Sequence, residues 1–409
     1  MDDCFVSSDL LSVDEAVGRL LAAVKPITGT ETLPLTLALG RVLAEEVTAR
    51  VDVPGHDNSA MDGYAVRSTD VGAGPLPVVG IAPAGSAPAT LEPRTAMRIF
   101  TGAPIPHGAD AVVMQEQTEL RDGLVSLPNT VRPGQNVRRA GEDVRAGAVV
   151  LTPGRRLRPQ DLGMAAAVGA GSLTVVRRLR VALLATGDEL VAAGNPLQPG
   201  QIYDSNGPTL HALLTALGFE CLPPVRLPDR RDATIAALET AAADADVIIT
   251  SGGVSVGDED HVKPAVAALG RLDLWRVAIK PGKPFAFGFV GDTPFLGLPG
   301  NPVSVFVTAL LLARPFLLRR AGITDHLDPL LSQVIAGFDW PRPDHKRREY
   351  LRARLTMLNG QAVAEIYPHQ GSGVLSSCAW ADGLVQVEPG QVIRPGDRIN
   401  YLGFADLLG

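Results

Sequence analysis

The sequence predicts a multidomain α/β protein built around a mostly parallel sheet with helices on both faces. The chain of 409 residues is too long for a single ordinary core, and with 46% hydrophobic residues it can bury several cores. From about residue 180 onward, strand and helix patterns alternate, and this alternation is typical of parallel sheets. On either side of this block, short extended runs between Gly and Pro indicate β-rich domains.

Helical patterns occur on both sides of the first β-rich stretch. Residues 12–24 have the apolar spacing of a helix, and Ser12 and Glu15 form a capping pair at its start. We expect further helices at residues 37–47 and 158–169. The helical pieces are expected to pack together, so that the β-rich stretch between them becomes an inserted domain.

The alternating block and the end of the chain complete the architecture. Apolar strands such as "RVALLAT", "DVIIT" and "PFLGL" are separated by helices, and a hairpin is expected at 275–290. The expected helices are 206–217, 233–243, one ending at Leu269, and 303–319. Four short extended runs after residue 327 predict a small β-barrel-like domain. The predicted domains are 1–50 with 144–179 (helical), 51–143 (β-rich), 180–326 (α/β) and 327–409 (β).

Composition excludes several classes of protein. A net charge of −7 disfavours nucleic-acid binding, which depends on summed Lys and Arg contacts. The three cysteines are far apart, so they predict neither a disulfide framework nor a cysteine zinc site. The first residues are acidic where a signal peptide would be basic, and the apolar run 305–313 is too short to span a bilayer. We therefore expect a cytoplasmic protein without a membrane partner.

Three polar turns are expected at one edge of the parallel sheet. They are "ATGDEL" (185–190), "TSGGVSVGDED" (250–260) and "LPGNPVS" (298–304), and each follows an apolar strand. Ligands of open α/β sheets bind beyond the carboxyl ends of the strands, so these turns predict a pocket. Gly252 and Gly253 would let the backbone approach an anion closely, although a Gly-Gly turn alone is also an ordinary tight connection.

Acidic residues in these turns indicate a divalent cation. Oxygen ligands from Asp188, Glu189, Asp258 or Asp260 suit Mg²⁺, which would lie between the carboxylates and an anion. The alternative is that Asp258 and Glu259 merely occupy the first turn of a helix, where negative charge is favourable. Of these residues, we expect Glu189 and Asp260 to hold the metal.

Basic residues elsewhere allow two interpretations. Lys280 and Lys283 flank a Pro-Gly turn, where they form either an oxyanion site or a solvated pair. The run "HKRREYLRARL" predicts Arg352 on one face of a strand, which either closes over a pocket or faces solvent. In the β-rich stretch, "HDNSAMDGYAVR" is either part of a site or a loop capped by Asn and Asp side chains, and Thr101 offers a hydroxyl ligand.

These motifs together resemble the molybdopterin molybdenumtransferase family, which includes the bacterial MoeA proteins and the gephyrin E domain. The ordered motifs span almost the whole chain; they are "DNSAMDGYAVR", "RIFTGAPIPHGADAVVMQE", "GEDV", "LLATGDEL", "IYDSNGPTL", "TSGGVSVGDED", "IKPGKPFAFG", "GLPGNPVS" and "GSGVLSS". The resemblance implies a MogA-like parallel-sheet domain. It also implies Mg²⁺-dependent ligation of molybdate to adenylated molybdopterin, with release of AMP.

The resemblance assigns roles by motif position. It implies functional roles for Asp62, Thr101, Asp143, Glu189, Asp229 and Asp260. It implies phosphate contacts from Ser251, Gly252, Gly253 and Ser255. It also places Lys280, Lys283, Arg352 and Ser377 near molybdate, in a pocket shaped by Pro299 and Pro302.

The resemblance further implies a homodimer. The β-rich insertion should project as a lobe that cannot fold back onto its own sheet, so Asp62 and Thr101 would complete the site of the other chain. Molybdopterin adenylyltransferase and acceptor molybdoenzymes are the other partners that it suggests. Two alternatives remain: a non-catalytic scaffold of the same fold, and an adenylyltransferase acting one step earlier. The sequence leaves open the choice between molybdate and tungstate.

Overall fold

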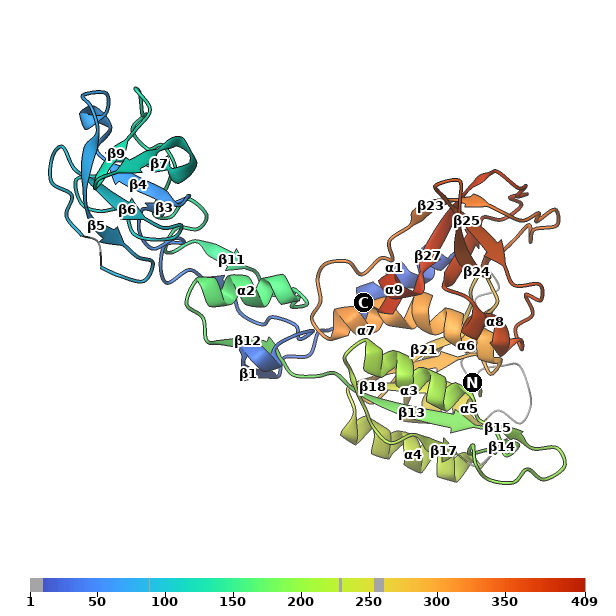
Figure 1. Ribbon diagram of the computed structural model, residues 1–409. Helices are drawn as coiled ribbons and strands as arrows, with labels where there is room; N and C mark the ends of the chain where they lie inside the picture. Colours follow the sequence, from blue (N-terminus) through green and yellow to red (C-terminus); the bar gives the residue numbers. More distant parts are fainter. Residues whose placement is uncertain (1–9, 88, 228–229, 254–260, 409) are drawn as a thin grey trace.

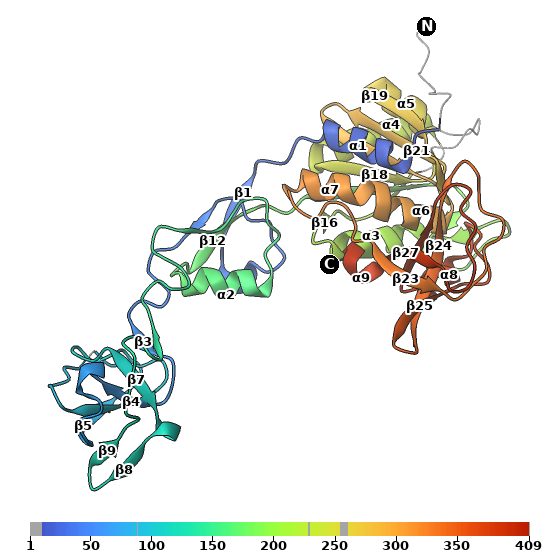
Figure 2. The same cartoon turned by 90° about the horizontal axis from the view of Figure 1, so that it is seen from above.

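The computed structural model describes residues 10–87, 89–227, 230–253 and 261–408. The molecule is elongated: a lobe of short strands lies at one end, an α/β body with a barrel at the other, and a slender middle segment joins them (Figures 1 and 2). The lobe is therefore well separated from the α/β body of its own chain.

The body contains the predicted sheet, in the order β16-β13-β18-β22-β21-β19, with β17 also paired to β13. The parallel strands are β13 (Arg180–Thr186), β16 (Glu220–Cys221), β17 (Val225–Leu227), β18 (Val247–Ser251) and β22 (Thr293–Leu298). Two antiparallel strands, β21 (Pro284–Val290) and β19 (Gly270–Arg276), form one edge. The mostly parallel sheet is thus confirmed, and the expected hairpin is this edge pair.

Helices cover both faces of the sheet because its strands are apolar on both sides. In β13, Val181 and Leu183 join the core cluster on one face, whereas Ala182 and Leu184 join the cluster on the other. The first face carries α1 (Val13–Ala23), α3 (Asn206–Ala216), α6 (Pro302–Thr308) and α7 (Arg314–Arg320), and the second carries α4 (Arg231–Asp244) and α5 (Val262–Leu269).

The helix from Pro302 to Arg320 is long and apolar. It consists of α6, a π-helical turn η4 (Ala309–Ala313) and α7. Within the described residues, it alone is long and apolar enough to cross a membrane by length and composition. However, 83% of its most apolar window is buried inside the protein, which is the pattern of a core helix.

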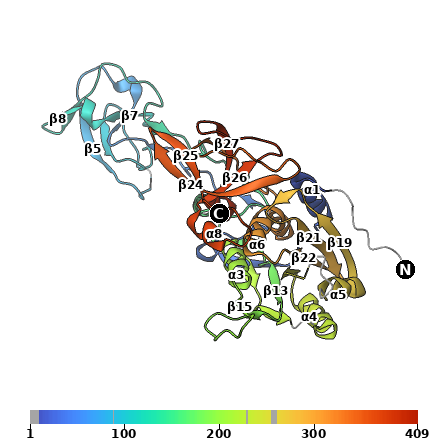
Figure 3. The same ribbon diagram turned by 90° about the vertical axis from the view of Figure 1, so that its right-hand side faces the viewer.

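The last part of the chain forms a closed five-stranded barrel. Its strands are β23 (Ser332–Ala336), β24 (Arg348–Leu358), β25 (Gln361–Ile366), β26 (Gly383–Val387) and β27 (Arg398–Gly403), and pairing of β24 with β26 closes it. Two short helices, α8 (Leu375–Trp380) and α9 (Phe404–Leu408), flank it. The barrel lies beside α6, and β20 (Ile279–Lys280) from the body pairs with β24 (Figure 3). The predicted β domain is confirmed.

The lobe is built from short strands, as expected for the insertion. They are β3 (Asn58–Ser59), β4 (Gly63–Val66), β5 (Leu76–Ala82), β6 (Ala96–Ile99), β7 (Ala111–Met114), β8 (Glu119–Arg121), β9 (Leu124–Ser126) and β10 (Val137–Arg138). Six of them form one sheet in the order β7-β4-β6-β5-β9-β8, and short turns η2 (Ser68–Asp70) and η3 (Gln115–Gln117) connect them.

The structure of the middle segment corrects one prediction. The helix expected at 37–47 is absent: η1 (Leu35–Leu37) is followed by a turn at Gly40, and Val42 and Leu43 pair with Arg156 and Val175 instead. Long-range pairing therefore overrides the local helical spacing. The segment otherwise contains β1 (Thr30–Pro34) paired with β12 (Ser172–Val176), β2 (Val47–Thr48) paired with β11 (Val149–Leu151), and α2 (Pro159–Ala167).

Helix α1 begins at the predicted capping box, in which Ser12 and Glu15 bond reciprocally. Its apolar face nevertheless does not pack with α2. Val13, Ala16 and Leu20 join the core of the body, where α1 lies against α7. The expectation that the helical pieces pack together is therefore wrong for α1, because the body offers its apolar face a larger core. The exact domain boundaries stay a prediction.

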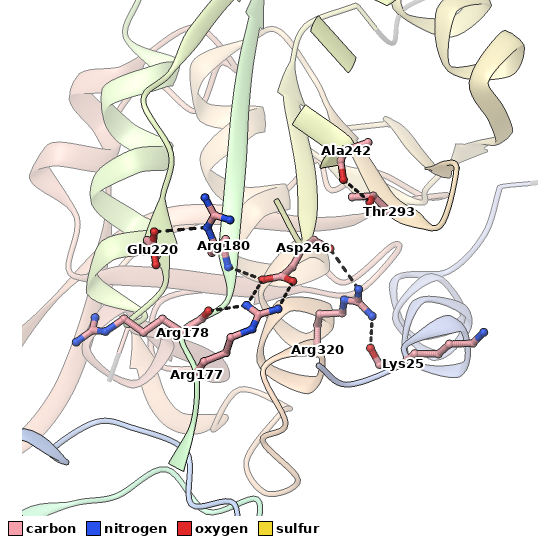
Figure 4. A network of polar contacts seen from close by, with 9 residues as sticks. All are labelled: Lys25, Arg177, Arg178, Arg180, Glu220, Ala242, Asp246, Thr293 and Arg320. Carbon is pink, nitrogen blue, oxygen red and sulfur yellow. Dashed lines mark hydrogen bonds and ion pairs between the residues drawn. The ribbon is translucent and has the colours of Figure 1, made fainter. Parts of the chain in front are cut away.

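A half-buried carboxylate holds the middle segment to the amino-terminal edge of the sheet (Figure 4). Asp246, just before β18, accepts hydrogen bonds from both terminal nitrogens of Arg177 at 2.6 and 2.7 Å and from the backbone of Arg180 at 2.8 Å. Arg320, at the end of α7, donates to the Asp246 carbonyl at 3.4 Å and to the carbonyl of Lys25. Four distant segments thus meet at one point.

Replacing Asp246 by Asn should lower the free energy of unfolding by about 2 to 3 kcal/mol, because it removes a charged acceptor from a largely buried site. Burial alone would raise the pKa of Asp246, but bonds from Arg177 and Arg180 outweigh it and lower the pKa below its ordinary 3.8. This stabilisation is therefore complete above that value and is lost as the pH falls through the lower folded pKa.

The measurement is denaturant unfolding of Asp246→Asn at several pH values. Glu220→Gln is the matched control, because Glu220 pairs with Arg180 at 3.6 Å with both side chains about half exposed, and it should change stability by less than about 0.5 kcal/mol. Equal effects of the two substitutions would contradict the role of Asp246.

Candidate active site

A cavity of about 510 Å³ lies at the carboxyl ends of β13, β18 and β22. Its walls come from the turns after these strands, the amino-terminal ends of helices and one segment of the barrel region. The lining residues are Thr186, Gly187, Glu189, Leu190, Ile202, Tyr203, Asp204, Ser205, Asn206, Thr234, Ser251, Gly252, Gly253, His261, Val262, Gly300, Pro302 and Gly373.

The three polar turns meet at this cavity, as predicted. Thr186 to Leu190, Ser251 to Gly253, and Gly300 to Pro302 all contribute lining residues. They meet because β13, β18 and β22 are parallel neighbours, so their carboxyl ends share one edge of the sheet.

The glycine turn after β18 requires glycine at both positions. Gly252 and Gly253 have φ values of +87° and +69°, which side-chain-bearing residues rarely adopt. A Cβ on Gly253 would lie 2.5 Å from Cγ2 of Val262, and one on Gly252 would lie 3.0 Å from Oγ1 of Thr186. The backbone therefore forms this part of the wall, where a ligand can approach it closely.

Two helices begin at the cavity. Ser205 and Asn206 stand at the start of α3, and His261 and Val262 at the start of α5. The first backbone N–H groups of a helix carry partial positive charge and lack partners within the helix. The wall of the cavity therefore favours anionic groups, even though none of its described lining residues is Lys or Arg.

Two carboxylates also line the cavity. Glu189 lies in the turn after β13, and its carbonyl accepts from the backbone of Ile202 at 2.9 Å. This bond belongs to a small flap in which β14 (Leu190–Val191) runs parallel to β15 (Ile202–Tyr203). Asp204 follows the flap and accepts from the backbone of Gly207 at 2.9 Å. Neither Lys nor Arg occurs among the described lining residues.

Asn206 adds a third oxygen to this side of the cavity. Its amide nitrogen donates to the carbonyl of Gly300 at 2.8 Å, while its buried Oδ1 has no partner within the described residues. A buried amide oxygen without a partner is costly unless a ligand satisfies it. The oxygens of Glu189, Asp204 and Asn206 form a hard donor set, the type that Mg²⁺ prefers. However, no cluster of three His, Cys, Asp or Glu residues is found within the described part of the chain.

The two predicted lysines do not line the cavity. Nζ of Lys280 lies 2.7 Å from Oε1 of the buried Glu349, an ion pair without aligned hydrogen-bond geometry. The other oxygen of Glu349 accepts from Trp340 and from the backbone of Asp344, both at 2.9 Å. Lys283 follows the Pro-Gly turn, before β21. Lys280 therefore joins the body to the barrel in this structure.

Arg352 and Ser377 lie together, but they are buried. Nε of Arg352 donates to Oγ of Ser377 at 3.0 Å, and Nη2 reaches the carbonyl of Gly371 at 3.4 Å. Burial lowers the pKa of Arg352 to about 10. Arg352 and Ser377 bond to the carbonyls of Gly371 and Val374, and thus hold Gly373, which lines the cavity, between two fixed positions. Arg352 is buried and bonded to the segment next to Gly373, so the solvated alternative for Arg352 is wrong.

The two predicted prolines sit at the turn after β22. Pro299 is buried directly behind the strand end, and Pro302 lines the cavity as the first residue of α6. The adjoining backbone N–H of Val303 donates to the carbonyl of Ser372 at 3.0 Å. This bond holds the turn against the braced segment of the barrel.

Three predicted residues lie outside the body. Asp62 is half-buried and Thr101 is exposed on the lobe, where the backbone and hydroxyl of Thr101 donate to Oδ1 of Asp62 at 2.7 and 3.0 Å. These bonds lower the pKa of Asp62. Asp143 is exposed at the base of the lobe, with its backbone bonded to Val53. The structure therefore does not bring these residues to the cavity of the same chain.

The remaining predicted residues, Asp229, Ser255 and Asp260, lie outside the described residues, as do Asp258 and Glu259. Sequence reasoning missed Asp204, Asn206 and His261, which line the cavity. The signal that could have identified Asp204 and Asn206 is their position immediately before a predicted helix, in the motif "IYDSNGPTL".

Comparisons with known proteins match this architecture along its length. Three family models match: the MoeA N-terminal region (domains I and II) at residues 11–169, the probable molybdopterin binding domain at 182–319, and the MoeA C-terminal region (domain IV) at 333–404.

Relatives match over nearly complete chains. The molybdopterin molybdenumtransferase of Haemophilus influenzae is 39% identical, over 98% of this chain and 100% of that protein. Molybdopterin molybdenumtransferase 2 of Mycobacterium tuberculosis is 41% identical, over 91% of this chain and 93% of that protein. The crystal structure of the molybdopterin biosynthesis MoeA protein of Pyrococcus horikoshii has a TM-score of 0.82 at 31% identity, over 96% of this chain and 100% of that chain. The chain therefore belongs to the molybdopterin molybdenumtransferase family and is a transferase of molybdenum cofactor biosynthesis.

Proposed function

We propose that this chain inserts molybdate into adenylated molybdopterin in a Mg²⁺-dependent reaction that releases AMP. The observation that carries the proposal is the meeting of three polar turns at one cavity, beside a backbone wall at Gly252 and Gly253. An adenylated pterin contains a phosphate anhydride, which is an extended polyanion. Backbone N–H groups and the starts of α3 and α5 suit such phosphates.

The carboxylates make a cation necessary for binding this ligand. Glu189 and Asp204 would repel phosphates across the cavity unless a positive charge lay between them. We propose that Glu189 holds Mg²⁺ together with Asp260, and we add Asp204 and the unpartnered Oδ1 of Asn206 as further oxygen donors. When bound, Mg²⁺ would neutralise phosphate charge and polarise the anhydride.

We place molybdate beside Pro302 and Gly373, next to the segment that Arg352 and Ser377 brace. The roles of Lys280 and Lys283 in holding the oxyanion remain part of the proposal. For Lys280 this role requires its ammonium to exchange Glu349 for the oxyanion, which its 43% exposed side chain permits. A doubly charged anion gains most from such a cation where water is partly excluded.

We propose that the chain works as a homodimer. Asp62 and Thr101 form a bonded pair on a lobe that lies far from the α/β body of its own chain (Figure 2). Two-fold association can place each lobe at the cavity of the other chain. A cytoplasmic location, with molybdopterin adenylyltransferase and acceptor molybdoenzymes as further partners, completes the proposal.

The first test is incubation of the purified chain with adenylated molybdopterin, molybdate and Mg²⁺, with AMP measured by chromatography. AMP should form only when all three components are present. A scaffold without activity would release no AMP. An adenylyltransferase would instead release pyrophosphate from ATP and molybdopterin. Either result would contradict the proposed reaction.

Replacing Glu189 by Gln should raise the Mg²⁺ concentration needed for half-maximal AMP release by about 10-fold or more, because a metal ligand loses its charge. The matched control is Glu239→Gln, since Glu239 is exposed on α4 away from the cavity. An unchanged Mg²⁺ requirement in Glu189→Gln would exclude Glu189 as a ligand.

The shared site is tested by combining two damaged chains. Co-expressed Asp62→Ala and Glu189→Gln chains, isolated as heterodimers with two affinity tags, contain one site with both defects and one intact site. They should recover about half the wild-type rate at a Mg²⁺ concentration where each homodimer is inactive. Heterodimers as inactive as both homodimers would show that the two residues act within one chain.

A further inference from the structure

The lobe carries an arginine in the same network as Asp62 and Thr101. Arg98 on β6 donates through Nη1 to the carbonyl of Gly63 at 3.2 Å and through Nη2 to Oε1 of Gln115. The backbone N–H of Gln115 in turn donates to the carbonyl of Asp62 at 3.1 Å. We call Asp62, Arg98, Thr101 and Gln115 the lobe cluster.

Arg98 is held in one position by its neighbours. Its guanidinium lies 5.2 Å from the ring centroid of Tyr64 and 5.2 Å from that of Phe100. Tyr64 is its direct partner across the β4–β6 ladder, so the first contact follows from strand register. Because the lobe already orders the side chain, a ligand that binds Arg98 pays little additional conformational entropy.

The charge of Arg98 is not neutralised by an ion pair with any carboxylate in the described part of the chain. Its polar bonds go to a carbonyl and to an amide, which carry no net charge. Asp62 is close enough for Arg98 to lower its pKa, but the bonds from Thr101 contribute more. The lobe cluster therefore presents an ordered cation beside a carboxylate that is already hydrogen-bonded.

The surface around the lobe cluster has the composition of a binding face. Met61 is 43% exposed and Phe100 is 38% exposed, directly beside Asp62 and Thr101. Apolar side chains around a few ordered polar groups are typical of ligand-binding sites. This face therefore needs an occupant that offers both apolar contact and negative charge.

The cavity of a second copy fits this requirement. Among its described lining residues it has the carboxylates Glu189 and Asp204 and no Lys or Arg, although the proposed substrate is a polyanion. We propose that Arg98 of each lobe enters the cavity of the other chain and binds a phosphate of the adenylated pterin. This inference rests on the proposed function, and it adds a substrate-binding residue supplied by the partner chain.

The first experiment compares Arg98→Met with the wild-type dimer. Met preserves much of the apolar stem but removes the charge, so contact with the two rings is partly retained. The KM for adenylated pterin should rise about 10- to 100-fold, the loss expected for a charge-assisted hydrogen bond, with little change in kcat. Arg98→Lys should show an intermediate KM, since it keeps the charge without the planar fork.

Arg121→Met is the matched control, because Arg121 lies on the same lobe, is 78% exposed and pairs only with Glu119 among the described residues. It should leave KM unchanged. The mass of the dimer in solution should be the same for all variants. If Arg98→Met dissociated the dimer without raising KM in the remaining dimer, Arg98 would bind the partner protein and not the substrate, and the inference would be wrong.

The deciding experiment is again a heterodimer. One chain carries Arg98→Met and the other Glu189→Gln, so that one site is intact and the other has both defects. The rate is measured at a pterin concentration below the wild-type KM and at a Mg²⁺ concentration where the Glu189→Gln homodimer is inactive, so that each single defect lowers the rate. Recovery to about half the wild-type rate supports binding from the partner chain. The reverse arrangement places both substitutions in one chain and pairs it with a wild-type chain, so each site has one defect and the rate should be lower.

Failure of this inference can be distinguished from failure of the proposed function. If wild-type protein releases no AMP, the function itself is wrong. If the Asp62 and Glu189 heterodimer recovers activity but the Arg98 and Glu189 heterodimer does not, the shared site stands and the role of Arg98 is overturned.

Discussion

The orientation of the lobe relative to the body depends on one carboxylate at the amino-terminal edge of the sheet. Asp246 binds both terminal nitrogens of Arg177, which lies where the middle segment enters the body (Figure 4). Strand β13 begins only three residues later, at Arg180. The same carboxylate therefore fixes the first strand of the sheet and the path of the arm that carries the lobe. Since the lobe is displaced along this arm, a small rotation at Asp246 becomes a large movement of Asp62 and Arg98.

The two ends of β18 differ in what they contact: the amino end lies among structural bonds, and the carboxyl end lies at the cavity. Its amino end follows Asp246, where an ion pair with Arg177 and hydrogen bonds from Arg180 and Arg320 hold four segments of the chain together. Its carboxyl end continues into Gly252 and Gly253, where the backbone is open to a ligand. The bonds at the amino end of β18 also help to fix the position of Gly252 and Gly253, because the strand between them is buried on both faces. The body thus separates structural charges from the charges that face the cavity.

Much of the body could be predicted because its signals are local. Buried parallel strands are continuous apolar runs, and their carboxyl ends must share an edge, so the meeting of three turns follows from the sequence. The partner of an amphipathic helix has no local signal, and this is why the packing of α1 on α7 was missed. Residues 37–47 have helical spacing, but pairing with distant strands decided their conformation.

The site was predicted less completely than the fold. The contribution of Asp204 depends on the parallel pairing of β14 and β15, which joins segments twelve positions apart and leaves no clear pattern. The contact of Lys280 with Glu349 and the burial of Arg352 depend on how the barrel closes. Polar residues therefore identify a site region, whereas their roles within it are set by tertiary contacts between distant parts of the chain.

The pairing of β20 with β24 has a consequence for how such a chain can be altered. The backbone of residues 276–280 lies between Leu11 and Arg348, with bonds to both, and Arg348 also binds Asp14 of α1. The barrel thus contacts the body through two segments that are remote in sequence: β20 pairs with β24, and Asp14 of α1 binds Arg348. A recombination event that exchanged the barrel would leave β20 of the body unpaired and Lys280 without its carboxylate partner Glu349. Among the described residues, the lobe is attached only through the middle segment, so it can be elongated away from Asp62, Arg98 and Thr101 without unpairing a strand of the body.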